Sequence, residues 1–120
     1  MINSPDDPFV PWEGGEAKRG KGGSLVSVLG TVDFWRQRDG CRASNEETLP
    51  ESAPGDNTKI SVRRYNNCRG NTAVVFYKIV GGGHTWPGGV DQPAWLVGRT
   101  SQELNATKVS WDFFQNHTLP

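Results

Sequence analysis

An apolar run that ends in three consecutive glycines constrains this sequence more than any other feature. Residues 72–80 are rich in β-branched and aromatic side chains, and residues 81–83 are all glycine, immediately before His84. A short apolar run of this kind is typical of a buried β-strand. It is far shorter than the roughly 20 apolar residues that span a bilayer. The sequence therefore predicts a buried strand at residues 72–80, followed at residues 81–89 by a loop that presents His84.

Two further segments show the periodicity of amphipathic helices. In residues 24–38 the apolar side chains recur on one helical face, and Ser24 stands where an N-cap is expected. In residues 105–116 the apolar positions again share one face. Because these helical patterns flank strand patterns, the fold class is predicted to be α/β.

The middle of the chain contains a second strand pattern and a polar stretch. Residues 58–65 alternate, with Ile60 and Val62 on one side, which predicts another strand. Residues 42–56 are polar and show no period, so a surface excursion without regular structure is expected there. With 120 residues and no internal repeat, residues 1–120 are expected to form one domain.

Charge and composition argue against several classes of function. Thirteen basic and thirteen acidic residues give a formal net charge of zero. A protein that binds nucleic acid or a membrane surface through phosphate groups is normally basic, so neither partner is expected. The chain opens without a basic segment followed by an apolar one, so no signal peptide is expected. The histidines and cysteines show no ligand spacing, so neither a metal ion nor another cofactor is expected.

His84 is the strongest candidate for a catalytic residue. Imidazole is the side chain best suited to proton transfer near neutral pH, and the preceding glycines leave the ring accessible. A turn histidine without a role fits the local pattern equally well. Asp6 and Asp7, in a proline-rich loop at residues 3–15, are candidate carboxylates. An Asp-Pro turn that caps its own backbone is, however, the commoner use of such residues.

Two cysteines and two loop tryptophans complete the candidate residues. Cys41 and Cys68 form no Cys-x-x-Cys pair, so zinc binding and thioredoxin-type chemistry are disfavoured. A disulfide and a pair of buried free thiols both remain open. Trp12 and Trp86 lie in loops, where an indole ring either stacks on a ligand or anchors the loop to the core.

Two segments together resemble a known family. Residues 3–15 (NSPDDPFVPWEGG) resemble the acid loop of the polyhydroxybutyrate depolymerase and feruloyl esterase group of α/β hydrolases. Residues 81–88 (GGGHTWPG) resemble the catalytic-histidine loop of the same group. The intervening motifs (VDFW at 32–35, DGC at 39–41) and the final helix follow the order of that family, so the resemblance covers nearly the whole chain.

The resemblance implies roles for individual residues. Asp7 matches the acid of a catalytic triad, His84 matches its base, and Cys41 with Cys68 matches a family disulfide. Asp6 aligns with a variable position. One departure lies in the same loop, where Ser4 and Pro5 replace the Gly-Thr that is common in the family. The implied fold is the C-terminal portion of an α/β hydrolase, incomplete as a stand-alone domain.

The serine of the triad is missing from this pattern. The family places it on a Gly-x-Ser-x-Gly turn before the acid, and the 120 residues contain no such motif. The resemblance therefore implies a secreted or periplasmic carboxylic-ester hydrolase whose acid and base lie here but whose nucleophile does not. The expected partners are a small or polymeric ester, with Trp86 and Trp12 as substrate-binding residues, and the upstream part of the same fold or a second copy. The alternative is a non-catalytic module that binds a ligand or self-associates.

Overall fold

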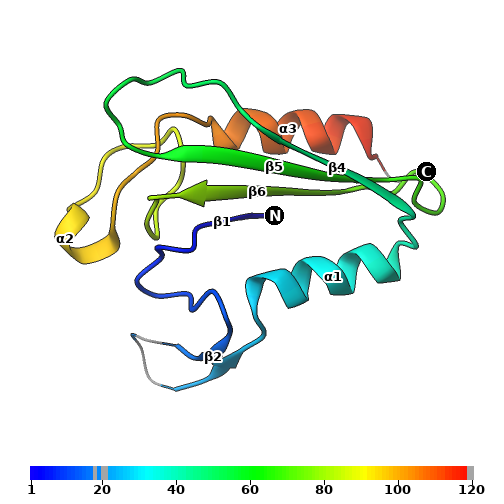
Figure 1. The fold of residues 1–120 in the computed structure, drawn as a ribbon, viewed down its shortest axis with the longest axis horizontal. Coiled ribbons are helices and arrows are strands. Elements are labelled where there is room, and N and C mark those ends of the chain that lie inside the picture. The colour runs from blue at the N-terminus through cyan, green and yellow to red at the C-terminus, as the bar shows by residue number, and fades with distance from the viewer. Residues whose placement is uncertain (18, 20–21, 119–120) are drawn as a thin grey trace.

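A four-stranded mixed sheet forms the centre of the molecule (Figure 1). The computed structural model describes residues 1–17, 19 and 22–118. The strands lie in the order β1-β6-β5-β4, with β1 parallel to β6 and the other two pairings antiparallel. Their bounds are β1 Ile2–Asn3, β4 Ala43–Thr48, β5 Lys59–Asn66 and β6 Val74–Val80.

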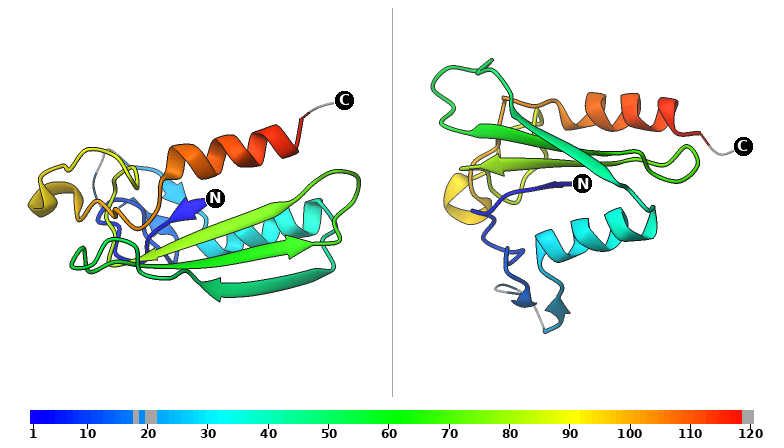
Figure 2. Two further views of the ribbon diagram at one scale, coloured as in Figure 1. Left: turned by 90° about the horizontal axis from the view of Figure 1, so that it is seen from above. Right: turned by 45° about the vertical axis from the view of Figure 1, so that its right-hand side comes forward.

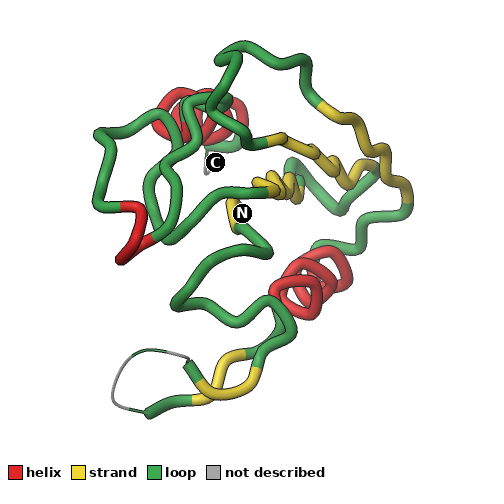
Figure 3. The backbone as a smooth tube through the Cα atoms, turned by 60° about the vertical axis from the view of Figure 1, so that its left-hand side comes forward, coloured by secondary structure: helices red, strands yellow, loops and turns green. Residues whose placement is uncertain are grey.

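Three helices and a small hairpin surround this sheet. The helices are α1 Val28–Arg38, α2 Ala94–Val97 and α3 Ala106–Asn116. Strands β2 Gly15–Glu16 and β3 Ser24–Leu25 pair with each other in an antiparallel hairpin. Figure 3 shows this hairpin projecting away from the four-stranded sheet.

Alternating residues of β6 divide the core into two layers. Val74 and Phe76 pack with Val28 and Val32 of α1. The intervening positions face the opposite side of the sheet, where Ile79 packs in a second cluster that includes Ile60, Val62, Leu104 and, from α3, Val109. Since successive side chains of a strand point to opposite faces, α1 and α3 cover opposite faces of the sheet (Figure 2). This is why the run at residues 72–80 is apolar at nearly every position.

The first helix begins later than the sequence pattern predicts. Ser24 is not an N-cap: it lies in β3 and pairs with Glu16. The cap is Ser27, whose Oγ accepts a hydrogen bond from the Gly30 N–H at 3.0 Å. A serine three residues further along satisfies the same backbone donors, and the apolar period alone does not distinguish the two starts.

The prediction of an irregular excursion at residues 42–56 is wrong for its first half. Ala43–Thr48 forms β4, an edge strand whose residues are all exposed. It is held by backbone pairing with β5 and by cross-strand ion pairs, in which Glu46 bonds Arg63 and Glu47 bonds Arg64. Hydrophobic periodicity detects strands with a buried face, so it does not detect a strand of this kind.

The second half of that stretch is ordered by a carboxylate from elsewhere in the chain. Glu103 accepts hydrogen bonds from the Ser52 N–H at 2.6 Å, the Ser52 hydroxyl at 2.9 Å and the Ala53 N–H at 3.0 Å. The backbone N–H of Ser52 is the main reason why the pKa of Glu103 lies below its ordinary value of 4.5.

The other predicted elements lie within two residues of their expected bounds. The strands expected at 58–65 and 72–80 are β5 and β6, and the helix expected at 105–116 is α3. Asn105 caps α3, because its side chain accepts a hydrogen bond from the Lys108 N–H at 2.9 Å. The short helix α2 has no counterpart in the sequence analysis.

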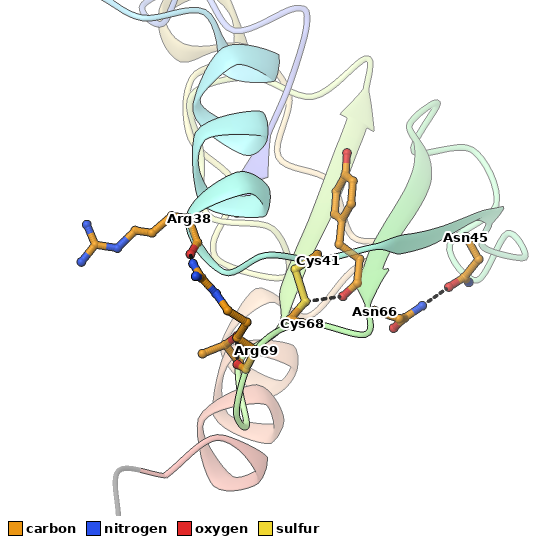
Figure 4. Close-up of a disulfide and its surroundings, with 8 residues drawn as sticks. Arg38, Cys41, Asn45, Asn66, Cys68 and Arg69 are labelled. Carbon is orange, nitrogen blue, oxygen red and sulfur yellow. Dashed lines mark hydrogen bonds between the residues drawn. A yellow bond between two sulfur atoms is a disulfide. The ribbon is translucent and has the colours of Figure 1, made fainter.

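A disulfide between Cys41 and Cys68 joins the end of α1 to the turn that follows β5 (Figure 4). This confirms the disulfide and excludes the alternative of two free thiols. Cys41 is buried in the same cluster as Val32 and Phe76, so the bridge is part of the core. Arg69 also donates a hydrogen bond to the carbonyl of Arg38, which ties the same two segments together.

Candidate functional site

The acid loop and the histidine loop meet because of the way β1 and β6 pair. The two strands are parallel neighbours, with Ile2 opposite Tyr77 and Asn3 opposite Lys78. The loops that follow them therefore leave the same edge of the sheet. This edge, at the carboxyl ends of parallel strands, is where open α/β sheets place their ligands.

Asp7 and His84 are 77 positions apart in the chain, and they form a hydrogen bond where these two loops meet. The distance from Nδ1 of His84 to Oδ2 of Asp7 is 2.9 Å. Asp7 is buried, whereas 53% of the His84 side chain is exposed. The contact that the family resemblance implies for these two residues is therefore present in the structure.

The second carboxylate oxygen of Asp7 is fixed by the backbone. Oδ1 accepts hydrogen bonds from the N–H groups of Phe9 at 2.7 Å and Val10 at 2.9 Å. Asp7 therefore forms the local capping turn and also bonds the imidazole of His84 through its other oxygen. Because Oδ1 is held by its own loop, Oδ2 is left in a defined position for the imidazole.

This arrangement makes His84 capable of acting as a base. A carboxylate at Nδ1 accepts the proton of that nitrogen and so favours the tautomer whose Nε2 is unprotonated. Within the part of the chain that the structure describes, Nε2 has no hydrogen-bond partner. The Phe9 ring packs against the imidazole, with ring centroids 5.0 Å apart, and restricts its rotation.

Backbone contacts on the far side of the histidine loop complete its support. The Gly83 N–H donates to the Arg99 carbonyl at 2.8 Å and the His84 N–H donates to the Val97 carbonyl at 2.6 Å. Residue 83 must be glycine here, since a Cβ atom would lie 2.2 Å from the Val97 oxygen. The glycines thus allow close approach of two backbones, in addition to leaving the imidazole accessible.

A pocket of about 360 Å³ opens beside the pair. His84, Asp7 and Trp86 all line it. The Trp86 indole is 59% exposed, and its N–H donates to the Thr107 hydroxyl at 2.9 Å, which fixes the orientation of the ring. Trp86 therefore lies at the same pocket as His84, which is the position that a substrate-binding role would require.

Trp12 lies elsewhere. Its ring packs against Phe76 of β6, with centroids 6.1 Å apart, on the cluster that contains α1. It does not line the pocket that contains His84. Of the two uses that the sequence left open for a loop tryptophan, Trp12 shows the anchoring one, because the acid loop folds back over the core.

No serine among the residues that the structure describes forms a hydrogen bond with Nε2 of His84. Ser24 follows two glycines and so resembles part of the Gly-x-Ser-x-Gly motif, but it lies in the projecting hairpin. The hydroxyl of Ser4 lines the pocket but donates to the Gly82 carbonyl at 2.6 Å.

Among the described residues, no group of three or more His, Cys, Asp or Glu side chains is placed to hold a metal ion. No helix in that part of the chain is both long and apolar enough to cross a bilayer.

Sequence reasoning missed two supporting residues and one surface. Phe9 and Ser4 carry no motif of their own, and only the meeting of the two loops shows what they contact. The surface is a groove of about 580 Å³ lined by residues of β1, β6, α1 and α3. Its apolar lining includes Met1, Ile2, Trp35, Val75, Val109 and Phe113.

Comparison with known proteins finds one relative. The chain is 36% identical over 91 residues to a protein named "Putative esterase NocK" from Nocardia uniformis subsp. tsuyamanensis. The match covers 73% of this chain and 26% of the relative, so the chain spans about a quarter of the length of that protein. No protein-family model matches the chain, and no solved structure matches it.

Proposed function

We propose that this chain contributes the acid and base of a serine carboxylic-ester hydrolase. The hydrogen bond between Asp7 and His84 is the observation on which this rests. The relationship to an esterase-named protein supports the reaction class. The sequence resemblance narrows it to an esterase of the polyhydroxybutyrate depolymerase, feruloyl or acetyl esterase type, with this chain as the last part of an α/β-hydrolase fold.

The mechanism follows from the geometry of the pair. A serine hydroxyl transfers its proton to Nε2 of His84 while its oxygen attacks the ester carbonyl. Asp7, bonded at Nδ1, stabilises the imidazolium that forms. The tetrahedral intermediate collapses, the alkoxide leaves with the proton from Nε2, and an acyl-serine remains. Water then attacks the acyl group while Nε2 of His84 removes its proton. The second tetrahedral intermediate collapses, His84 returns the proton to the serine oxygen, and the acid is released.

We place the serine outside these 120 residues, because they contain no Gly-x-Ser-x-Gly motif. The groove beside β1 fits the addition of such a segment, because the described residues pair one edge of β1 with β6 and place no strand on the other. A parallel strand added there would extend the sheet and cover Met1, Trp35 and Phe113. We assign this place to the nucleophile-bearing part of the same hydrolase. The relative is about four times as long as the matched region, which leaves room for such a part.

A second candidate is a non-catalytic module that self-associates. The observation that favours it is the apolar surface around the same groove, where Trp35 is 42% and Phe114 63% exposed. Mass measurement in solution separates the two candidates. A stable dimer of the isolated chain that dissociates when Phe114 is replaced by Arg would favour self-association.

The disulfide favours an oxidising compartment. Disulfides persist in secreted and periplasmic proteins and are rare in the cytosol. We therefore place the protein outside the cytoplasm, together with its substrate, a small or polymeric ester.

The test is an ester-hydrolysis assay in two forms. The isolated chain should hydrolyse p-nitrophenyl acetate no faster than its His84→Ala variant, because the nucleophile and oxyanion donors supply most of the rate. The polypeptide encoded with the reading frame upstream of Met1 should be active, and His84→Ala should lower its turnover by about 10⁶-fold. An active longer polypeptide that is insensitive to His84→Ala would contradict the proposal. So would an isolated chain whose turnover depends on His84 and whose own serine reacts with a fluorophosphonate.

A further inference from the structure

Among the described residues, the acid loop forms two hydrogen bonds with the histidine loop besides the Asp7–His84 bond. Oδ2 of Asp6 accepts a hydrogen bond from the Gly81 N–H at 2.7 Å. The Ser4 hydroxyl donates to the Gly82 carbonyl at 2.6 Å and accepts from the Asp6 N–H at 3.1 Å. Ser4 is buried, so its hydroxyl and the carbonyl it bonds have little access to water as an alternative.

The histidine loop depends on such contacts because of its composition. Three successive glycines have no Cβ atom and a wide choice of backbone angles, so the chain by itself does not fix the direction in which His84 leaves β6. Gly81 adopts a φ of 82°, in the left-handed region. The bonds from Asp6 and Ser4 hold the first two of these glycines, whereas the backbone bonds to residues 97 and 99 hold Gly83 and His84.

We propose that Asp6 and Ser4 are positioning residues, which hold Gly81 and Gly82 so that Nδ1 of His84 meets Asp7. This inference rests on the proposed function for its importance, but its geometry is independent of any substrate. Asp6 is not a second triad acid, since its carboxylate bonds a backbone N–H rather than the imidazole. The two neighbouring carboxylates therefore have different partners. Asp6 bonds the backbone of the histidine loop, and Asp7 bonds the imidazole ring of His84.

The experiment measures the tautomer of His84 directly. The chain is labelled with ¹⁵N-histidine, and the ratio of the Nδ1–H to the Nε2–H tautomer is read from the imidazole nitrogen shifts at a pH where both histidines are neutral. His117, the C-cap residue of α3, serves as an internal reference. The variants are Asp6→Ala, Asp6→Asn and Ser4→Ala. Glu51→Ala, in the connection between β4 and β5, is the matched control for the loss of one carboxylate.

The proposal predicts a specific pattern. Asp6→Ala lowers the tautomer ratio of His84 by roughly three- to tenfold, the effect expected for one hydrogen bond. Asp6→Asn retains an oxygen acceptor for the Gly81 N–H and keeps the ratio within about twofold of the parent. Ser4→Ala lowers the ratio, whereas Glu51→Ala leaves it unchanged, and none of the variants changes the His117 signal.

Several outcomes would overturn the inference. An unchanged His84 ratio in Asp6→Ala would do so, whether or not the thermal midpoint falls, because stability and positioning are then separate. A fall in Asp6→Asn as large as that in Asp6→Ala would assign the effect to charge rather than to the hydrogen bond. Since no substrate is used, these results do not depend on esterase activity. An inactive esterase with a responsive tautomer would remove the proposed function and leave the positioning role.

Discussion

Removal of the disulfide is expected to cost this small chain a large part of its stability. Cys41 and Cys68 are separated by 27 positions, and the bridge closes a loop that contains β4 and β5. The chain-entropy relation for a loop of this length gives about 3.5 kcal/mol, from the conformations that the bridge removes from the unfolded chain. At about 4 °C per kcal/mol for a chain of 120 residues, this corresponds to a fall in the unfolding midpoint of about 14 °C.

The assay compares a Cys41→Ala/Cys68→Ala double variant with the parent, each with and without reductant. Urea unfolding followed by tryptophan fluorescence gives the free energy of unfolding. Reductant should lower the stability of the parent towards that of the double variant and should leave the double variant unchanged. Because Cys41 is buried, the substitution also removes core contacts, and the reduced parent separates this contribution from the loss of the cross-link.

Two results would refute this reasoning. A difference of less than about 1 kcal/mol between oxidised and reduced parent would show that the unfolded chain is not freed by reduction, contrary to the entropic account. A double variant as stable as the oxidised parent would show that α1 and β5 are held together without the bridge.

Three further predictions concern the site and its surroundings. Gly83→Ala should displace the histidine loop and cost about 1–3 kcal/mol through overlap with the Val97 carbonyl, whereas Gly55→Ala meets open space and costs only backbone strain; thermal midpoints of both variants test this. Folding lowers the pKa of Glu103 below its ordinary value of 4.5. The ionised Glu103 carboxylate therefore stabilises the folded chain above pH 4.5, and this stabilisation is lost as the pH falls below that value. The stability difference between the parent and Glu103→Gln should therefore shrink between pH 7 and pH 3, and a constant difference in urea midpoints would contradict the assignment. In the longer polypeptide, Asp7→Asn should lower kcat by roughly 10⁴-fold by favouring the wrong tautomer of His84, and an unchanged kcat would remove Asp7 from the triad.

The sequence alone determined the elements that bury an apolar face. The run at residues 72–80 contains β6, Ile60 and Val62 face the core from β5, and α3 begins one residue after its predicted start. These features are local, because burial of alternate or periodic side chains leaves its mark on neighbouring positions. The disulfide and the choice of Asp7 over Asp6 came instead from the resemblance of two motifs to a family.

Only the tertiary structure decided the features that depend on pairing between distant segments. Hydrophobic periodicity did not predict β4, because all its residues are exposed. Its pairing with β5 depends on backbone hydrogen bonds and ion pairs, which leave no period in the local sequence. The helix start moved from Ser24 to Ser27 because Ser24 pairs with Glu16 across the hairpin.

The site shows the same division. The sequence identified His84 and Asp7 as candidate functional residues. Their 2.9 Å contact, however, arises from the parallel pairing of β1 with β6, which no single segment of the sequence specifies. The positions of the two tryptophans also depend on the fold. Both lie in loops, and only the tertiary structure shows that Trp12 packs on Phe76 whereas Trp86 lines the pocket with His84. Local sequence specifies which side chains are available, whereas long-range backbone pairing specifies which of them meet.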